Sequence, residues 1–553
     1  MSYPSLSRAG RCLVAPLAFL ALSLAPLTGA LAEEAPSILS NGSFTQDDDH
    51  NGAPDGWPGA GGPISYGDDE GVKFLRIKSE VPDKMYSVHR MIEIPADVKA
   101  LELSFKARTT NLVAGKEKWF DARIIMNFKD AAGAKIGSPS APYLRKDTQG
   151  WTDRKSQFLV PEGATTLEFM PSLMNVKSGT FELADFSLVP IDAEKLKAEA
   201  AAKAAQKAKA DAVVSEDPKK EAWPPAVHVV GNQLQTAEGK PVWLQGVNVV
   251  SLEWSEKGES VLASTKEAIE VWKANIIRLP VKESYWFGRE NQTDGGQSYR
   301  ATVDAVITMA ANRGAYVLLD LHRYKAPKPE YVEFWKDAAA RYKDHPAVIF
   351  DIMNEPHSTT WEVWRNGGFI EEKKKKTDED NFGTEANLSK DGYQSPGMQG
   401  LVEAVRSTGA KNVIAAGGLD YAYDLSGVVN GFALEDKTGN GIMYSTHIYN
   451  WKKDWQNKVL VAAEKYPIIV GELGADVKKM GFIPAGAQED PMTWSPDMIG
   501  LIQKYKLNWT AFSFHPGATP RLILDWSYAP TPFWGQFTKD ALSGKQFELK
   551  KLR

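Results

Sequence analysis

The chain has 553 residues, more than one hydrophobic core usually organises, so two or more domains are expected. Hydrophobic residues make up 43% and charged residues 24% of the sequence, as in an ordinary globular protein. The net charge of −5 excludes the basic signature of a nucleic-acid-binding protein. The 17 tryptophans are many, and their flat rings can provide platforms for ligands such as sugar rings.

Residues 1–32 have the pattern of an export signal. Two arginines precede an apolar run over 13–27, and the Ala-Leu-Ala sequence at 30–32 is typical of a cleavage site. We expect cleavage after Ala32 and a secreted or periplasmic bacterial protein. The apolar run is too short and too interrupted by proline to span a membrane, so no membrane span is expected. The sole cysteine, Cys12, lies in this segment, so the mature chain would lack disulfides and thiolate metal sites.

Residues 33–192 are predicted to form an all-β sandwich. Segments that are alternating or rich in β-formers recur between turn signals, at 101–107, 121–128, 165–171 and 179–190. The opening Asn-Gly-Ser-Phe, an Asp-Gly-Trp at 55–57 and the closing segment resemble carbohydrate-binding modules of the galactose-binding-like jelly-roll type. The resemblance implies that Asn41 to Phe44 begin the first strand and that residues 185–188 belong to the last.

A sugar-binding role and a purely structural role are both open for this sandwich. Trp119, Tyr143 and Trp151 are the aromatic side chains to test as a sugar platform, with packing as the alternative for each.

Residues 193–222 are rich in alanine, lysine and glutamate, a composition typical of a semi-rigid helical linker. About twenty helical residues would span roughly 30 Å. The lysines are expected to form a solvated helix face, with contact to an anionic surface as the alternative.

Residues 223–553 alternate short apolar strands with amphipathic helices. Eight strand segments are predicted, at 241–249, 275–280, 315–322, 347–355, 412–418, 441–449, 467–474 and 508–515. Helical periodicity is clear between them, for example at 259–274, 297–314 and 395–409. This alternation predicts the α/β class, with a parallel sheet covered on both sides, and eight units favour a (β/α)8 TIM barrel. A doubly wound open sheet is the alternative, although no glycine-rich phosphate loop follows the first strand.

Polar residues gather at the predicted ends of several strands, which form the mouth of a barrel. They are Arg278, His322, Asn354, Glu355, His447, Tyr449 and Glu472. Glu355 and Glu472 are far apart in sequence, and a closed barrel would bring them face to face. Two such carboxylates suit glycoside hydrolysis, in which one is protonated and donates to the leaving oxygen while the other is ionised.

The neighbouring residues suit these needs. Arg278 could hold Glu472 ionised through a charge-assisted hydrogen bond, and Tyr449 could orient the same carboxylate. His447 could lie near Glu355 and tune its proton. Asn354 could bind a substrate hydroxyl beside the reacting carbon.

The segment from about 225 to 545 resembles glycoside hydrolase family 5, the cellulase-type retaining β-glycosidases. The motifs that carry the resemblance are IIRLP at 276–280, LLDLH at 318–322, DIMNEP at 351–356, STHIYNW at 445–451 and VGELG at 470–474. The resemblance implies Glu355 as general acid/base and Glu472 as nucleophile, with a covalent intermediate and a gap of about 5 Å between the carboxylates. His322 is expected to contact the substrate.

One position departs from the family pattern. The family usually has a tryptophan after the eighth strand, where this chain has Phe512, and His515 or Trp526 could take over part of its role. A charged insertion at 365–392 follows the fourth unit and is expected to be a solvated loop that could also wall a cleft. Trp361 and Trp364 precede this insertion and could stack on sugar or pack internally.

Two other functions are open at this stage. A metal-dependent barrel hydrolase would use His322, His447, Glu355 and His357, although no HExxH or HxH motif is present and no metal or cofactor is expected. A carbohydrate-binding protein without activity is the second. We expect a monomer that acts on a polysaccharide or oligosaccharide, either β-glucan or β-mannan. Linkage and endo or exo action stay open.

Overall fold

The computed structural model describes residues 36–117, 119–148, 150–371, 392–480, 483–484 and 486–553. The expected export signal with Cys12, and the charged insertion between Glu371 and Gly392, lie outside the described residues. Within the described part of the chain, no helix is both long and apolar enough to cross a membrane. The chain divides into two compact units, Met1–Leu196 and Lys197–Arg553.

The first unit consists of two antiparallel sheets that enclose one hydrophobic core. One sheet has the order β1-β2-β11-β5-β9, and the other has the order β3-β10-β6-β7, with β4 beside β10 and β8 beside β6. Strand β6 alternates strictly between buried and partly exposed residues, because successive side chains point to opposite faces of a sheet. A strand forms at each of the four predicted segments. The bounds are β1 Ile64–Asp69, β2 Val72–Lys78, β3 Lys84–Ser87, β4 Arg90–Glu93, β5 Ala100–Val113, β6 Ala122–Lys129, β7 Lys135–Gly137, β8 Tyr143–Leu144, β9 Thr152–Leu159, β10 Thr166–Val176 and β11 Ser178–Pro190.

The expectation that Asn41 to Phe44 begin the first strand is wrong. These residues form turns, and the first strand of the described chain is β1. Asn41 and Phe44 adopt left-handed φ angles of 49° and 57°, which lie outside the β region of a regular strand. The Asn41 side chain accepts hydrogen bonds from the backbone N–H groups of Thr45 and Gln46, so local side-chain bonding replaces a sheet ladder.

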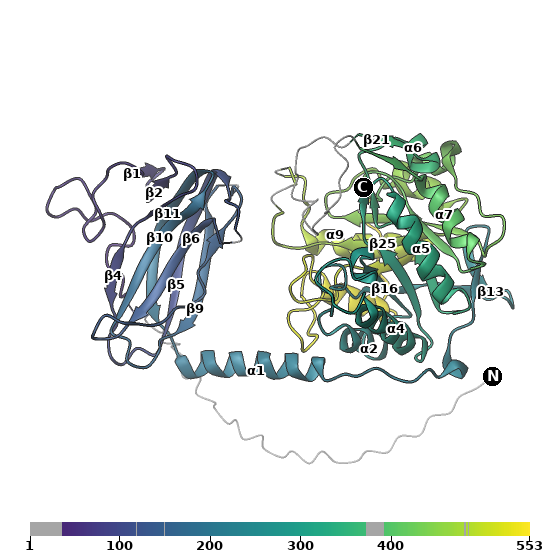
Figure 1. Cartoon of the computed structure of the whole chain (residues 1–553), viewed down its shortest axis with the longest axis horizontal. Helices are drawn as coiled ribbons and strands as arrows, with labels where there is room; N and C mark the ends of the chain where they lie inside the picture. Colours follow the sequence, from purple (N-terminus) through teal and green to yellow (C-terminus); the bar gives the residue numbers. More distant parts are fainter. Residues whose placement is uncertain (1–35, 118, 149, 372–391, 481–482, 485) are drawn as a thin grey trace, which may run out of the picture. The chain divides into compact units, whose positions relative to one another are not determined.

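The segment expected as a linker begins with helix α1 (Ala193–Asp211; Figure 1). The side chains of this helix are mostly exposed. The chain then continues without regular structure to a short 3-10 turn, η1 (Lys220–Ala222). The end of this segment is bound to the second unit. Asp211 accepts a hydrogen bond of 2.7 Å from the Ser260 hydroxyl, and Glu216 forms a salt bridge of 2.7 Å with Arg313.

The second unit is a closed barrel of eight parallel strands, so the predicted TIM barrel is confirmed. Each predicted strand segment contains one barrel strand. Around the barrel these are β15 Gln245–Asn248, β16 Ile276–Val281, β17 Tyr316–Leu321, β19 Val348–Asp351, β23 Ile414–Gly417, β24 Ile442–Tyr449, β25 Ile468–Gly474 and β26 Asn508–Ala511.

Helices cover the outside of the barrel, among them α2, α4, α5 and α7 (Figure 1). The helix bounds are α2 Val261–Glu270, α3 Glu283–Trp286, α4 Gln297–Ala311, α5 Pro329–Tyr342, α6 Trp361–Asn366, α7 Gly397–Ser407, α8 Val461–Ala463, α9 Pro491–Tyr505 and α10 Gly535–Leu542, with π-helical turns η3 Val428–Phe432 and η4 Gln456–Leu460. Short strands complete the unit: β12 Val227–Val230, β13 Gln233–Thr236, β14 Pro241–Val242, β18 Tyr324–Lys325, β20 Glu355–Pro356, β21 Gly368–Ile370 and β22 Tyr393–Ser395.

Side chains of the barrel strands alternate between two cores. Ile276, Leu318 and Ile349 belong to a small cluster inside the barrel, whereas Ile277, Leu319 and Phe350 belong to the larger cluster under the helices. The apolar interior fills the lower part of the barrel. Continuing the same alternation, the polar residues nearer the strand ends point inward at the mouth.

Candidate active site

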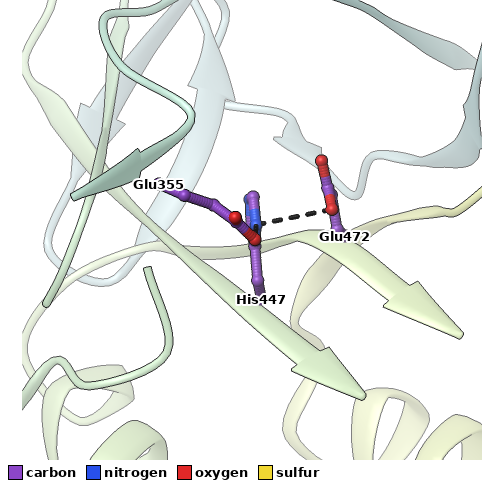
Figure 2. A group of neighbouring side chains, drawn as sticks. All are labelled: Glu355, His447 and Glu472. Atoms are coloured by element: carbon purple, nitrogen blue, oxygen red, sulfur yellow. Dashed lines mark hydrogen bonds and ion pairs between the residues drawn. The ribbon is translucent and has the colours of Figure 1, made fainter. Parts of the chain in front are cut away.

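The mouth of the barrel brings together two glutamates and a histidine from three strands (Figure 2). Glu355 comes from β20, His447 from β24 and Glu472 from β25. His447 Nδ1 lies 3.0 Å from Glu355 Oε1 and 3.6 Å from Glu472 Oε2. One oxygen of each carboxylate and a histidine nitrogen all lie within 4.8 Å of one another. The closed barrel therefore places the two glutamates face to face.

A β-bulge at Gly471 turns Glu472 into the mouth. Val470 pairs with Thr446, but the next pair is Glu472 with His447, so β25 contains one extra residue at Gly471. The bulge reverses the alternation, since both Val470 and Leu473 belong to the outer core. A side chain on Gly471 would meet Ser445 Oγ at 2.6 Å and His447 Nε2 at 3.2 Å, which explains why glycine is needed here.

Hydrogen-bond donors hold the Glu472 carboxylate from two sides. Arg278 Nη1 donates to Glu472 Oε1 at 2.8 Å, and the Tyr449 hydroxyl donates to Oε2. A carboxylate that accepts charge-assisted and hydroxyl hydrogen bonds is stabilised in its ionised form. Arg278 and Tyr449 therefore lie where the sequence analysis expects them.

Glu355 has the opposite environment. Its side chain is 15% exposed and contacts His447. Burial raises the pKa of Glu355 well above its ordinary value, and the negative charge of Glu472 raises it further. Burial lowers the pKa of His447 well below its ordinary value, so this imidazole is neutral at neutral pH. One carboxyl of the pair thus favours the protonated form while the other binds two donors.

The guanidinium of Arg278 is fully buried and binds more residues than its sequence motif suggests. It lies 3.1 Å from Asp320 Oδ2 and 3.0 Å from Asp351 Oδ2. It also donates to Asn248 Oδ1 at 3.0 Å. Sequence reasoning missed Asn248, Asp320 and Asp351. The signal that could have found the two aspartates is a carboxylate inside an apolar strand, since a buried charge requires a partner.

Asn354 and His322 lie in the same mouth. Asn354 Oδ1 accepts from Arg278 Nη2 at 2.8 Å, while its buried Nδ2 has no partner among the described residues and is available to donate. His322 Nδ1 lies 2.7 Å from Asp320 Oδ2, and His322 Nε2 lies 3.1 Å from the Tyr324 hydroxyl. Burial lowers the pKa of His322 to about 3. Both ring nitrogens are occupied, so the Tyr324 hydroxyl, which sequence reasoning missed, ends this chain of hydrogen bonds.

Phe512 follows β26 and lies next to the strand that carries Glu472. Its backbone N–H donates to the carbonyl of Leu473 at 2.9 Å, and its carbonyl accepts from the Trp534 indole at 2.9 Å. The side chain is partly exposed. Phe512 thus lies beside the strand of Glu472, and its equivalence to the family's tryptophan stays a prediction.

The expected substrate role of His515 needs correction. Its Nδ1 accepts from the Gly517 N–H at 3.0 Å, and its Nε2 lies 3.2 Å from Glu259 Oε2. Its ring contacts Trp254 and Trp526 edge to face, with centroids 5.5 and 5.0 Å away. His515 is thus a support for these two partly exposed indoles. Trp526 is partly exposed, so a sugar can still contact it. Trp254 is partly exposed as well, and it was not among the substrate contacts predicted from the sequence.

The two tryptophans of α6 differ. Trp364 is 0% exposed and donates from its indole nitrogen to the carbonyl of Gly417, so its expected contact with substrate is wrong. The ring of Trp364 is covered by the barrel and its N–H group is hydrogen-bonded, so neither can contact a substrate. Trp361 is partly exposed and packs against Trp364 and Phe432, with centroids 4.9 and 6.2 Å away.

Of the four residues expected for a metal-dependent hydrolase, Glu355 and His447 lie together, whereas His322 and His357 bind other groups. His357 stacks on Tyr421 at 4.0 Å and contacts the Ser358 hydroxyl, and His322 is bound to Asp320 and Tyr324. Among the described residues of the mouth, the group whose spacing would admit a metal ion is Glu355, His447 and Glu472.

Comparison with known proteins places the barrel in a family. The profile of "Cellulase (glycosyl hydrolase family 5)" matches residues 235–518, which is half of the chain. Endoglucanase MaCel5A of Microbulbifer sp. (strain ALW1) is 23% identical over 325 residues, covering 56% of this chain and 55% of the relative. Endoglucanase E-5 of Thermobifida fusca is 24% identical over 301 residues, covering 52% of this chain and 55% of the relative. The chain therefore spans about half the length of these curated relatives.

Solved structures of the same kind are also similar. A beta-glucanase of Saccharophagus degradans is 21% identical and aligns with 60% of this chain and 98% of its own, with a TM-score of 0.46. The catalytic domain of a Thermobifida fusca endoglucanase is 20% identical and aligns with 57% of this chain and 97% of its own, with a TM-score of 0.42. Because the family profile covers half of the chain, including the mouth of the barrel, the chain belongs to glycosyl hydrolase family 5, the cellulase family.

Proposed function

We propose that the barrel hydrolyses β-1,4-linked glucan with retention of configuration at the anomeric carbon. The observation that carries this proposal is the separation of Glu355 and Glu472, whose nearest oxygens lie within 4.8 Å. Retaining glycosidases have carboxylates about 5 Å apart, whereas inverting enzymes leave about 6.5–9.5 Å for a water molecule.

In the first step, Glu472 attacks the anomeric carbon as the glycosidic bond breaks. Glu355 gives its proton to the departing glycosidic oxygen, so the leaving chain departs as a neutral alcohol. The glycosyl group is then held as an ester of Glu472. The raised pKa of Glu355 supports its role as the acid, and the donors Arg278 and Tyr449 support Glu472 as the nucleophile.

In the second step, Glu355 is a carboxylate and removes a proton from water. The water oxygen attacks the anomeric carbon, the ester bond to Glu472 breaks, and both glutamates return to their starting states. The free Nδ2 of Asn354 is placed to donate to the hydroxyl next to the reacting carbon, where a hydrogen bond strengthens in the transition state. The Tyr324 hydroxyl offers a second polar contact in the same mouth.

The names of the relatives favour glucan and endo action over mannan, since the similar curated proteins are endoglucanases. The proposal is tested with a panel of β-glucans and β-mannans with product sizing. We expect the viscosity of soluble cellulose derivatives to fall early, with oligosaccharide products. Glu472→Gln should lose at least about a thousandfold in kcat, as expected when a nucleophile is removed. Full activity of this variant, or products of inverted configuration, would contradict the mechanism.

Two measurements on the parent chain distinguish the other functions. A carbohydrate-binding protein without activity would show sugar binding but no hydrolysis by the parent chain. A metal-dependent hydrolase would lose activity on treatment with a chelator and regain it with added metal. We expect the chelator to have no effect, because the proposed steps require only Glu355 and Glu472.

We further propose that the first unit is a carbohydrate-binding module of jelly-roll type. Trp119 and Tyr143 are 52% and 56% exposed. Tyr143 lies in β8, which pairs with the start of β6, and Trp119 lies three residues before the first residue of that strand. Arg145, beside Tyr143, donates to the carbonyl of Glu117 and so joins the two segments. The exposed rings of Trp119 and Tyr143, both near the start of β6, are suited to stacking on sugar.

Trp151 is not part of this surface. Its indole donates to Asp69 at 3.2 Å, and its ring packs on Phe74 and under Arg108, so packing is its role.

The test of this module uses the Glu472→Gln chain and insoluble cellulose. We expect Trp119→Ala and Tyr143→Ala each to weaken binding severalfold, since stacking contacts contribute about 0.5–1.5 kcal/mol. Met91→Ala is the matched control, because Met91 is equally exposed on β4 of the same sheet. Equal binding by all three variants would contradict the proposal.

We also propose that the protein is exported as a monomer and is cleaved after Ala32. N-terminal sequencing of the secreted protein tests the cleavage site, and light scattering tests the monomer.

A further inference from the structure

A single guanidinium in the mouth of the barrel contacts three carboxylates. Arg278 Nε lies 3.0 Å from Asp351 Oδ2, Nη2 lies 3.1 Å from Asp320 Oδ2, and Nη1 lies 2.8 Å from Glu472 Oε1. All four residues are buried. Three ionised carboxylates around one cation would leave two uncompensated negative charges in a site from which water is nearly excluded, and such burial is costly.

The other titratable groups that face this cluster do not supply a second cation. Burial lowers the pKa of His322 to about 3 and that of His447 well below its ordinary value, so both rings are neutral. Two other cations among the described residues are close enough to act on this cluster, and each is paired with another carboxylate. Lys452, which influences Glu355, binds Asp420 at 2.9 Å, and Arg323, which influences His322, binds Glu283 at 2.5 Å. Glu355 and Glu253 have raised pKa values, mainly because they are buried, and Tyr324 and Tyr449 are raised for the same reason.

Asp320 and Asp351 lie side by side, and each has one carboxyl oxygen without a hydrogen-bond partner among the described residues. They are register partners on the adjacent parallel strands β17 and β19, about 4.8 Å apart, and both point into the barrel. Both bind the same edge of the guanidinium, through the adjacent nitrogens Nη2 and Nε. Each leaves Oδ1 buried without a partner among the described residues. Two such oxygens repel one another when both carboxyls are ionised, whereas one proton between them forms a hydrogen bond.

The two aspartates differ in how many donors they receive. Asp320 Oδ2 forms an ion pair of 3.1 Å with Arg278 Nη2 and also lies 2.7 Å from His322 Nδ1. We assign the proton of the neutral His322 ring to Nδ1, which faces Asp320 Oδ2, so that Nε2 accepts from the Tyr324 hydroxyl 3.1 Å away. Asp351 Oδ2 has Arg278 alone among the described residues. More donors stabilise the ionised form, which assigns the charge to Asp320.

We propose that Asp351 is protonated in the active protein and donates from Oδ1 to Asp320, so that Arg278 serves Asp320 and the nucleophile Glu472. Asp351 is then a positioning residue, which acts through the guanidinium and not on the substrate. The titration supports the same assignment. Burial raises the pKa of Asp351 to about 8, against the opposing charge of Arg278, and burial raises the pKa of Asp320 to about 7.

Asp351→Asn tests the proposal because an amide imitates a protonated carboxyl. Its Nδ2 can donate to Asp320 while its Oδ1 accepts from Arg278, so kcat/KM near pH 6 should stay within about threefold of the parent. Asp320→Asn is the matched control. It removes the anion that faces both Arg278 and His322, and kcat/KM should fall about 10- to 100-fold, as when a supporting hydrogen-bond partner is removed.

Two further readouts do not depend on activity. In the infrared spectrum of the full chain labelled with ¹³C-aspartate, a protonated-carboxyl band at pH 6 should be present and should disappear in Asp351→Asn. An acid with a raised folded-state pKa binds more protons when folded, so its contribution to stability falls as pH rises from about 4 to about 8. The Tm of Asp351→Asn relative to the parent should therefore increase across this range.

The inference rests on the proposed hydrolase for its kinetic readout, and the two can fail separately. If no β-glucan or β-mannan is cleaved, the proposed function is wrong while the infrared and Tm measurements still decide the state of Asp351. If Asp351→Asn is folded but as inactive as Asp320→Asn, and no aspartate band is lost, then Asp351 acts as an anion and the inference is wrong.

Discussion

One cluster of ion pairs in the first unit has balanced charges, whereas the cluster at the mouth of the barrel does not. In the first unit, Arg76 and Arg108 bind Glu182, and Arg108 also binds Asp69, so two guanidiniums meet two carboxylates. In the barrel, the single guanidinium of Arg278 meets Asp320, Asp351 and Glu472. Arg76 is 39% exposed, whereas Arg278 is completely buried.

The difference shows what each cluster does. The balanced cluster of the first unit joins three strands, β1, β2 and β11, to β5 through compensated charges at a partly hydrated surface. The barrel places three carboxylates around one guanidinium in a nearly dry site. The stability of the rest of the fold must offset the free-energy cost of burying this excess negative charge. Strong perturbation of carboxyl pKa values is a feature of functional sites, and here it separates the roles of Glu355 and Glu472.

The largest expected effect concerns the proton on Glu355. The proposed mechanism requires Glu355 in its protonated form, and its pKa is raised by burial and by Glu472, so kcat/KM should fall as pH rises through that raised pKa. Glu355→Gln should lose about 10²- to 10⁴-fold in kcat on substrates with poor leaving groups, together with this alkaline limb. The measurement is a pH profile of both proteins. Glu182→Gln is the control from the balanced cluster, and its activity should equal that of the parent.

Replacement of arginine by lysine should separate the two clusters by stability. Arg278→Lys leaves buried carboxylates without their fork of donors and should lower the free energy of unfolding by about 3–5 kcal/mol. Arg76→Lys changes a partly exposed pair and should lower it by about 0–1 kcal/mol. Denaturant unfolding measures both. If the two variants lose equal stability, the excess charge of the barrel has no energetic consequence and the comparison is wrong.

A smaller effect is expected from one methyl group at the bulge. Gly471→Ala places a Cβ against Ser445 and His447, which should shift the imidazole and cost about 1–3 kcal/mol of stability. Activity should fall about tenfold, because the geometry between His447 and the two glutamates changes. Gly59→Ala in the first unit is the control, since a Cβ there meets nothing within 4 Å. If Gly471→Ala has the same stability and activity as the parent, the bulge can accommodate a Cβ atom and glycine is not required there.

Much of the barrel could be predicted because its pattern is local. Each of the eight predicted segments contains a barrel strand, since a strand buried on both faces is apolar over its whole length. The polar residues at strand ends were predictable for the same reason, because they interrupt that apolar pattern. Asn41 to Phe44 were mispredicted because a side chain that bonds to its own backbone looks like any other residue in a sequence.

The sequence alone determined the order of strands and helices and the residues that carry chemistry, because hydrophobic periodicity and strand-end position are readable along the chain. Only the tertiary structure decided which of these residues meet. The bulge at Gly471 places Glu472 beside His447, burial removed Trp364 from the list of substrate contacts, and both nitrogens of His515 bind protein groups. Likewise, Asp320 and Asp351 became important only when register placed them beside one guanidinium. Distances across the barrel and access to water are properties of the closed fold, and they set the charge of each carboxyl.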